Sequence, residues 1–486
     1  MLKLSLSYSA VLSALMLSAC ASVGPDYQRP ALELPGSAKT ENLASAGKPG
    51  LLAADLTQWW AQFQDPVLTD LILEAAKYNQ DLLLATGRIE EARALAVGAT
   101  SNRYPTVDAT LVGTKVRTSE NAGKLAAGAN PVSKDFQLGL TASYEVDVWG
   151  KLSRADEAAK ARLLAQEQNR NVVQTTLFSN LAQSYFALRA ADAQLKLAQE
   201  TDKTRAENLR LQQKRRAAGA ISELDLHQAE AETASAEASV AQAKQNVANL
   251  ESAIAVLLGR SPAGIAHPVI ARGSEISSLY QHLQLPADLS SEVLNRRPDI
   301  LAAEQALVAA NADIGQAKAA YFPSLKLTSG IGYESRVFKD LVDPSSLLWN
   351  LGANLVQPVF RAGAIGAVVA GAEARKTQAT AQYVQAVQGA FRDVHDALNN
   401  AEANAQLYTA NQKRVLALKD SQRLAELRYK NGYSSYLEVL NAQRDLAQVE
   451  SGLIETQRAH LSAVVGLYKA LGGGWNNAAS ANVQKP

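Results

Sequence analysis

The sequence predicts a mainly α-helical protein in which long coiled-coil helices form a helical barrel. Four β-strands per chain contribute to a shared, twelve-stranded, trimeric membrane β-barrel. Three observations predict this fold. Two very long segments almost lack proline and glycine, neighbouring segments alternate between apolar and polar residues, and the same order of elements occurs twice along the chain.

The composition excludes some classes of protein. The 486 residues carry a formal net charge of +1, and charged residues of both signs, 20% of the chain, are interspersed. No nucleic-acid partner is therefore expected. Hydrophobic residues make up 47% of the chain and aromatic residues only 6%, with many alanines, which suits long, closely packed helices better than a bulky globular core.

The N-terminus is typical of a bacterial lipoprotein signal. Lys3 precedes an apolar stretch, and small residues lead to Cys20, the only cysteine. We expect residues 1–19 to be a signal peptide and Cys20 to carry a covalent N-acyl and S-diacylglycerol lipid, with no other cofactor. In bacterial lipoproteins the next residue directs sorting, and Ala21 in place of aspartate favours the outer membrane. An ordinary cleaved signal with a chance cysteine is the alternative.

The chain contains an internal two-fold sequence repeat. Matching landmarks occur in the same order in both halves: Tyr104-Pro105 and Phe322-Pro323, Gly219 and Gly432, Gly259 and Gly472. The landmarks predict six segments: the signal peptide (1–19), an N-terminal anchor and belt segment (20–65), a first repeat (66–258), an equatorial linker (259–297), a second repeat (298–471) and a C-terminal tail (472–486).

Each half begins with a helical stretch, about Pro66 to Ser101 and about Pro298 to Ala320, that leads into two strand-like segments. From Phe136 to Val148 apolar residues alternate strictly with polar ones, and residues 325–333 and 349–355 alternate less cleanly. One such strand could be half-buried in a soluble sheet. The runs match the ~9 to 11 residues of a transmembrane strand, however, and have aromatic residues near their ends, which favours membrane strands. The aromatic residues are Tyr104, Trp149, Phe322 and Trp349.

The longest predicted elements follow the strands. Residues Lys151 to Ala218 contain no proline or glycine, and Glu373 to Asn431 contain only Gly389. A single helix over the first segment would be ~100 Å long. Apolar and small residues recur in it at alternating steps of four and three, which is a coiled-coil seam. A shorter helix follows each long one, about Glu223 to Leu258 and Tyr436 to Leu471.

Four membrane strands per chain cannot close a barrel. An open sheet edge leaves amide groups without partners in hydrocarbon, so the barrel must be shared between chains. Three chains give twelve strands around an aqueous lumen, whereas the eight strands of two chains would enclose only side chains. The sequence thus predicts a homotrimeric channel in outer-membrane lipid, extended through the periplasm by a hollow helical barrel.

No catalytic or metal site is predicted. The histidines show no close metal-ligand spacing, and only His395 has an adjacent carboxylate, Asp396. Both methionines, Met1 and Met16, lie in the predicted signal peptide, so the mature chain offers no thioether to soft metals. We therefore predict that the protein is not an enzyme and has no catalytic, cofactor-binding or metal-binding residues.

Several short motifs occur together over nearly the whole chain. They are Val23-Gly24-Pro25-Asp26-Tyr27, Trp59-Trp60, Arg296-Arg297-Pro298-Asp299-Ile300, Gln357-Pro358-Val359-Phe360 and Tyr468-Lys469-Ala470-Leu471-Gly472. In combination they resemble the outer-membrane factor family of tripartite efflux systems, the TolC-like proteins, and most closely its acylated, OprM-like lipoprotein branch.

The resemblance implies a lipid-anchored homotrimer in the cell outer membrane that extends into the periplasm. It also implies two partners, a periplasmic adaptor (membrane-fusion) protein and an inner-membrane transporter, usually of the resistance-nodulation-division type. Members of the family passively conduct antibiotics, dyes, detergents, solvents or metal ions to the outside. A duct for protein secretion with the same fold, or a coiled-coil lipoprotein without a pore, is the alternative, and the alternating strand pattern opposes the latter.

A candidate periplasmic gate also follows from the resemblance. In family members the turns at the end of the helices constrict the closed channel, with acidic residues on the returning helix. The matching positions hold Asp225 and Glu438, and the gate would include Arg428, Tyr429 and Lys430 near the second turn. The alternative is that Asp225 and Glu438 are ordinary first-turn carboxylates, which the helix dipole favours.

Overall fold

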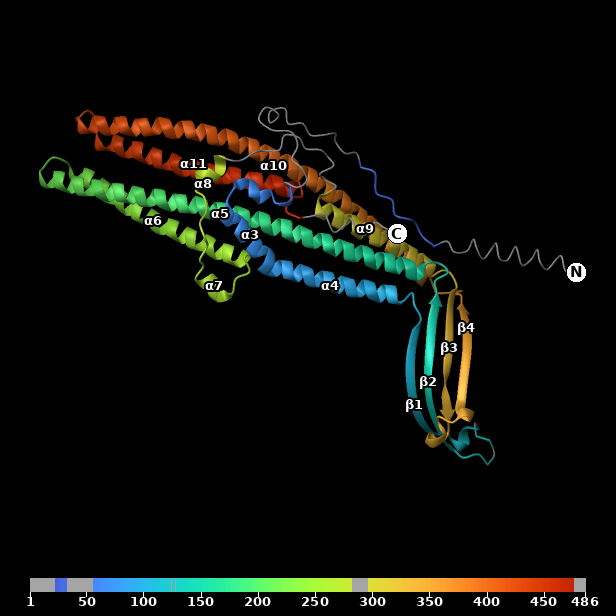
Figure 1. The fold of residues 1–486 in the computed structure, drawn as a ribbon. Helices are drawn as coiled ribbons and strands as arrows, with labels where there is room; N and C mark the ends of the chain where they lie inside the picture. The colour runs from blue at the N-terminus through green and yellow to red at the C-terminus, as the bar shows by residue number, and fades with distance from the viewer. Residues whose placement is uncertain (1–21, 33–55, 124, 127, 282–295, 476–486) are drawn as a thin grey trace. The chain divides into compact units, whose positions relative to one another are not determined.

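The computed structural model describes residues 22–32, 56–123, 125–126, 128–281 and 296–475 (Figure 1). These residues form two compact units. The sheet unit contains the described parts of Met1–Ala31, Arg88–Gln166 and Ala302–Tyr383. The hairpin unit contains those of Leu32–Gly87, Glu167–Leu301 and Val384–Pro486. The predicted signal peptide (1–19) and Cys20 lie outside the described residues.

The sheet unit contains a four-stranded antiparallel sheet. Its strands, hydrogen-bonded in the order β1-β2-β3-β4, are β1 (Thr106–Arg117), β2 (Val132–Val146), β3 (Ser324–Ser335) and β4 (Leu347–Val356). The shortest, β4, has 10 residues, which is long enough for a transmembrane strand. Among the described residues, no strand lies beside the outer edge of β1 or of β4. The predicted four strands are all present in the part of the chain that the structure describes.

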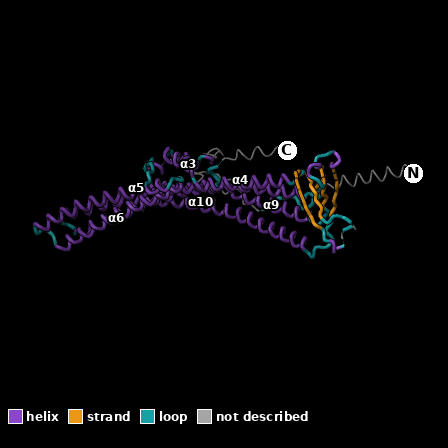
Figure 2. The backbone as a smooth tube through the Cα atoms, turned by 90° about the horizontal axis from the view of Figure 1, so that it is seen from below, coloured by secondary structure: helices purple, strands orange, loops and turns teal. Residues whose placement is uncertain are grey.

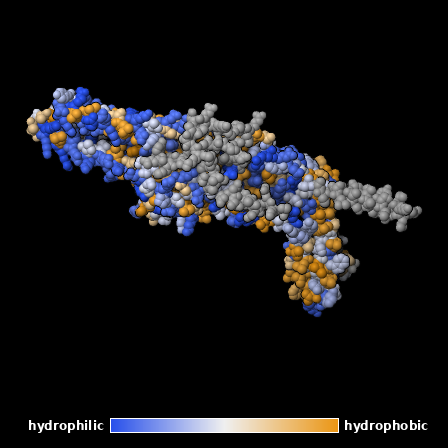
Figure 3. Space-filling view, turned by 45° about the horizontal axis from the view of Figure 1, so that its top comes forward, coloured by the Kyte–Doolittle hydropathy of each residue, from blue (hydrophilic) through white to orange (hydrophobic). Residues whose placement is uncertain are grey.

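The register places most of the apolar side chains of the four strands on one face. One row across the sheet is Leu111, Leu138, Tyr333 and Leu347, and the next row on the same face is Ala109, Leu140, Ile331 and Trp349. Trp349 is 75% exposed in the single chain. Figure 3 shows hydrophobic atoms gathered over the strands. This face is suited to contact lipid.

The opposite face of the sheet is polar. One of its rows is Asp108, Thr141, Gly330 and Asn350, and another is Thr106, Ser143, Thr328 and Gly352. Small and hydrogen-bonding side chains therefore line the side away from the apolar rows. A sheet with one apolar and one polar face has the pattern of a barrel wall that separates lipid from an aqueous lumen.

Two pairs of helices have equal lengths. The helices α5 (Lys151–Ala217) and α10 (Ala364–Lys430) have 67 residues each, and the helices that follow them, α6 (Glu223–Leu257) and α11 (Tyr436–Ala470), have 35 each. Figures 1 and 2 show α6 beside the C-terminal part of α5. Within the described ranges, no helix combines the length and the hydropathy needed to cross a membrane. The predicted helices are confirmed, except that α10 begins before Glu373 because the helix accommodates Gly366 and Gly371.

The other described helical elements are shorter. They are η1 (Trp59–Phe63), α3 (Pro66–Tyr78), α4 (Gln80–Ser101), η2 (Glu120–Ala122), α7 (Pro262–Ala266), α8 (Ile276–Gln281), α9 (Pro298–Ala319), η4 (Phe338–Asp340) and η5 (Pro344–Ser346).

The prediction of one helix from Pro66 to Ser101 was wrong at Asn79. The backbone of Asn79 is extended there, with ψ of 133°, and its side-chain oxygen accepts hydrogen bonds from the amides of Asp81 and Leu82 at 2.9 and 3.2 Å. Its side-chain amide also donates to the carbonyl of Leu257 at 2.9 Å. Asn79 thus ends α3, caps α4 and binds the end of α6.

Aromatic residues form the core of the hairpin unit. Trp59 of η1 is fully buried and stacks on Tyr468 of α11, with ring centroids 5.9 Å apart. Phe63 contacts Phe186 of α5 at 4.8 Å. The predicted seam of α5 is buried along the same stretch, at Leu177, Leu181 and Leu188. The Trp59-Trp60 motif therefore anchors the segment before α3 to both hairpins.

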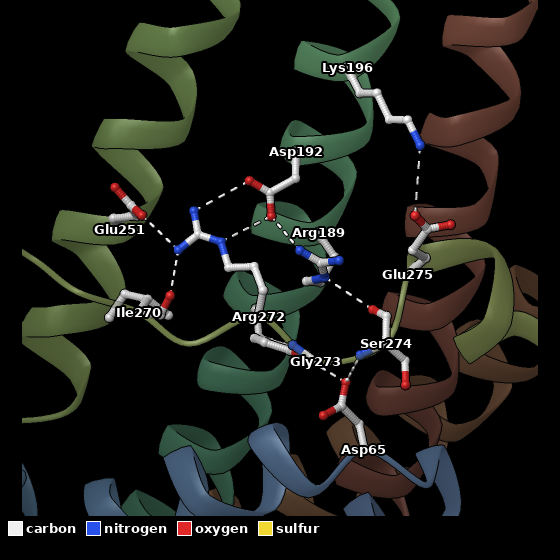
Figure 4. A network of polar contacts seen from close by, with 11 residues as sticks. Asp65, Arg189, Asp192, Lys196, Glu251, Ile270, Arg272, Gly273, Ser274 and Glu275 are labelled. Carbon is white, nitrogen blue, oxygen red and sulfur yellow. Dashed lines mark hydrogen bonds and ion pairs between the residues drawn. The ribbon is translucent and has the colours of Figure 1, made fainter.

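Ion pairs hold part of the predicted equatorial linker between two helices (Figure 4). The guanidinium of Arg272 binds Asp192 of α5 at 3.1 Å and Glu251 of α6 at 2.7 Å. Burial lowers the pKa of Arg272, but hydrogen bonds and charges from the two carboxylates outweigh it, so the net shift is upward. Arg272 stays charged and cross-links α5 to α6.

Candidate functional site

The first helical turn lies between α5 and α6. Gly219 has φ of 71°, and the amide of Ala220 donates to the carbonyl of Arg215 at 2.8 Å, which closes the end of α5 as a Schellman motif. Ser222 then begins α6. The Ser222 hydroxyl accepts from the amide of Asp225 at 3.2 Å, and the Asp225 carboxylate accepts from the amide of Ser222 at 3.2 Å. The pair is a capping box.

The second turn, between α10 and α11, has the same backbone plan. Gly432 has φ of 78°, and the amide of Tyr433 donates to the carbonyl of Arg428 at 2.9 Å. Ser435 makes no side-chain capping bond. The carboxylate of Glu438 lies 4.0 Å from the guanidinium of Arg428, and both side chains are more than half exposed. The two turns therefore share geometry but use their acidic residues differently.

A side-chain contact joins the two hairpins near these turns. The Arg215 guanidinium donates to the hydroxyl of Tyr429 at 2.9 Å and lies 5.4 Å from the centre of the Tyr429 ring. The contact combines a hydrogen bond with a cation-π interaction. It connects the last turn of α5 to the last turn of α10.

A second layer of polar contacts lies further from the turns. The Glu232 carboxylate of α6 forms ion pairs with Arg205 of α5, at 3.7 Å, and with Arg444 of α11. Arg205 also donates to the side-chain oxygen of Gln443 at 2.5 Å, and Asn208 donates to the hydroxyl of Tyr436. Burial raises the pKa of the Tyr436 hydroxyl, so this group remains a neutral hydrogen-bonding partner. Three helices are cross-linked by these groups.

The structure places the predicted gate residues in different environments. Arg428 is paired with Glu438, Tyr429 contacts Arg215, Asp225 caps its own helix, and Lys430 is exposed. Sequence reasoning missed Arg215. Its signal was present in the run Lys214-Arg215-Arg216, but such a run is equally favoured by the dipole at a helix C-terminus. Among the described residues, no group of histidine, cysteine and acidic side chains could hold a metal ion.

The sheet with one apolar and one polar face, joined to duplicated helical hairpins, defines a subunit of a channel-forming outer-membrane protein. The chain belongs to the outer membrane efflux protein family, whose model matches residues 71–260 and 289–473. The two matched segments correspond to the two halves of the repeat.

Named relatives and solved structures agree with the family. The cation efflux system protein CusC of Escherichia coli strain K12 is 36% identical over 95% of this chain and 98% of its own. The probable outer membrane lipoprotein SilC of Salmonella typhimurium is 34% identical, and the solvent efflux pump outer membrane protein SrpC of Pseudomonas putida is 32% identical, each over 95% of this chain and 97% of its own. The Campylobacter jejuni CmeC outer membrane channel has a TM-score of 0.88 at 27% identity, covering 96% of this chain and 98% of that one.

These similarities confirm the predicted class, fold and location. The chain is an outer-membrane channel subunit of an efflux pump, located in the cell outer membrane and extending into the periplasm. Efflux, rather than protein secretion, is the function of the family.

Proposed function

We propose that three copies of the chain form one passive channel that receives solute from a periplasmic adaptor protein and an inner-membrane transporter of the resistance-nodulation-division type. The open outer edges of β1 and β4 are the observation that supports this proposal most strongly. Unpaired strand edges cannot lie in hydrocarbon, so the sheet needs further copies to close. Three copies give twelve strands, and the polar face of each sheet then lines an aqueous lumen.

The proposal includes a lipid anchor on Cys20. The position of this residue after small side chains supports it, as does the similarity to SilC, a probable outer membrane lipoprotein. The segment that follows is held tightly within the sheet unit. The Val23 amide donates to the carbonyl of Trp149 at 3.0 Å, and Arg29 binds the Glu304 carboxylate through its Nε at 2.7 Å.

The proposal also includes a gate at the two helical turns. Arg215 and Tyr429 would hold the two hairpins of one copy together in the resting channel, and Arg428 with Glu438 would add a weaker, solvent-screened pair. A partner protein that replaces these few polar contacts with its own could open the tip. The channel would then conduct only after the partner protein has docked.

The exported substrate is proposed to be selected by the partners rather than by this subunit. CusC is named for cation efflux and SrpC for solvent efflux, so relatives serve chemically different pumps. Soft cations such as Cu(I) prefer thiolate and thioether ligands. The chain after position 20 contains neither cysteine nor methionine, which opposes soft-metal coordination by the channel itself.

Two measurements test the proposed channel. Multi-angle light scattering of the protein in mild detergent should give the mass of three chains, and planar-bilayer recordings should show a conducting pore. A monomer or dimer that is also non-conducting would reject the proposal. A trimer that conducts only weakly until a cognate adaptor is added would support both the channel and its gate.

A further inference from the structure

The loop after β4 exposes two apolar side chains. Val359 is 94% exposed and Phe360 is 85% exposed. The base of this loop is nevertheless fixed, because the side-chain amide of Gln357 donates to the carbonyls of Tyr321 and Pro358, both at 3.0 Å. An ordered apolar pair that is this exposed in the single chain marks a contact surface.

A second exposed aromatic residue lies at the other edge of the sheet. Tyr104, 64% exposed, belongs to the turn between α4 and β1. The turn is ordered: the amide of Tyr104 donates to the carbonyl of Ser101 at 3.0 Å, and Arg103 binds the buried carboxylate of Asp156 at 3.1 Å. Tyr104 is thus held at the start of the strand that forms one open edge.

The antiparallel order of the sheet relates these two surfaces. Because neighbouring strands alternate in direction, β1 and β4 run in opposite senses. The end of β4, at Val356, and the start of β1, at Thr106, lie at the same end of the strands, so they come near each other when β4 of one copy pairs with β1 of the next. The residues just after Val356 then meet the residues just before Thr106 of the neighbouring copy.

The equivalent junction inside one chain shows what forms there. Trp149, just after β2, stacks on Phe322, just before β3, with ring centroids 4.7 Å apart and an angle of 28° between the planes. The Trp149 indole also donates to the carbonyl of Pro323 at 2.8 Å. In the sequence repeat, Phe322-Pro323 corresponds to Tyr104-Pro105, and the end of β2 corresponds to the end of β4. The β2–β3 junction joins the first repeat to the second.

We propose that Phe360 of one copy stacks on Tyr104 of the next copy, with Val359 beside it, and so repeats between copies the contact that Trp149 and Phe322 make within each copy. The partner on this surface is therefore a second copy of the same chain. This inference rests on the proposed trimer. It adds a specific contact at the end of the membrane strands. The contact between the two repeats of one copy and the contact between repeats of neighbouring copies would then have the same form.

Cysteine cross-linking in the assembled protein tests the contact. The double variant Tyr104→Cys, Phe360→Cys should form covalent dimers and trimers on treatment with a short bismaleimide, with more than half of the chains linked. Each single variant should remain unlinked. A control pair, Tyr104→Cys with Val337→Cys, carries its second cysteine at the opposite end of the strands and should also remain unlinked.

A second pair, Asn102→Cys with Val359→Cys, leaves both aromatic rings in place and should link copies in the same way. The experiment then separates the formation of the trimer from the formation of the stack between Phe360 and Tyr104. A trimer by light scattering in which neither pair links would overturn the stack and leave the proposed channel standing. A wild-type protein that is not a trimer would reject the channel itself. Linking by either double variant, with unlinked controls, supports the stack.

Discussion

The Tyr185 hydroxyl donates a 2.8 Å hydrogen bond to the Asp65 carboxylate, and both side chains are buried. Asp65 also caps α3 and accepts from the amide of Ser274 at 3.1 Å, so one carboxylate holds three segments that are far apart in the sequence. Burial, followed by the hydrogen bond to Asp65 and then the Asp65 charge, raises the pKa of Tyr185, which remains neutral and able to donate.

Replacement of this tyrosine should therefore destabilise the hairpin unit. Tyr185→Phe keeps the ring but removes a donor from a buried carboxylate, at an expected loss of ~1–3 kcal/mol in the free energy of unfolding. Denaturant unfolding followed by circular dichroism measures the loss. The exposed Tyr78 provides the control, and equal stability of Tyr185→Phe and Tyr78→Phe would contradict the role assigned to the hydrogen bond.

Removal of the contact between the hairpins should open the resting channel. In Arg215→Ala the Tyr429 ring loses its cation and its hydrogen-bond donor, so single-channel conductance or open probability should rise several-fold in planar bilayers. Lys214→Ala removes the same charge from an exposed neighbouring side chain and should behave as wild type. If both variants change conduction equally, the loss of local positive charge causes the effect, and the contact between Arg215 and Tyr429 does not.

The two acidic residues at the turns should differ when replaced singly. Asp225→Ala removes half of a capping box, at an expected cost of ~0.5–2 kcal/mol in helix stability, whereas Glu438→Ala removes only an exposed pair. The double variant should lower the cation preference of the channel, because both carboxylates contribute to a negative local field. Reversal potentials under a salt gradient measure that preference. An unchanged preference would limit Asp225 to helix capping and Glu438 to its exposed pair with Arg428, with no part in ion selection.

Acid should weaken the sheet unit through Asp156. Burial raises the pKa of this carboxyl, but hydrogen bonds from Thr100, Lys160 and Arg103 outweigh burial, so the net pKa lies below its ordinary value of 3.8. A pKa that is lower in the folded state stabilises the protein above the unfolded pKa, and this stabilisation is lost as pH falls below about 4. Asp156→Asn should flatten that part of the stability profile, and Asp70→Asn, at an exposed position of α3, provides the comparison. Melting temperatures measured from about pH 3 to about pH 6, the range around which carboxyl groups titrate, would show the difference.

The lipid anchor can be tested by mass. The purified mature protein should begin at Cys20 and carry the added mass of the acyl groups, and Cys20→Ser should weaken membrane association while the sheet still inserts. The apolar face of the strands is independent of the lipid, which is why insertion should survive. A mature chain with an unmodified residue 20 would remove the anchor from the proposal.

Much of the fold was predictable because its signals are local and periodic. The alternation from Phe136 onward places every second side chain on one face, and the register confirms a single apolar face across four strands. The absence of proline and glycine after Lys151 predicted α5 almost to its last residue. Because of the repeat, the elements predicted for the first half of the chain also predicted those of the second half.

The contacts between segments distant in the sequence were not predictable. Asn79 interrupts a helical pattern with a polar residue that helices tolerate on an exposed face, and only its contact with Leu257 reveals why the break is there. Arg215 meets Tyr429 across more than two hundred positions of the sequence, which no local pattern encodes. Arg272 lies in a segment without periodicity, although its ion pairs join two helices.

The equal lengths of the paired helices have a consequence for how this protein can evolve. One extra residue in α5 would turn every later side chain by about 100° and advance it by about 1.5 Å. Arg215 would then rotate away from Tyr429, while α10 would remain unchanged. An insertion or deletion is therefore tolerable only when both helices of a hairpin and both halves of the chain change together. The duplicated halves must keep the same length even where their residues have diverged.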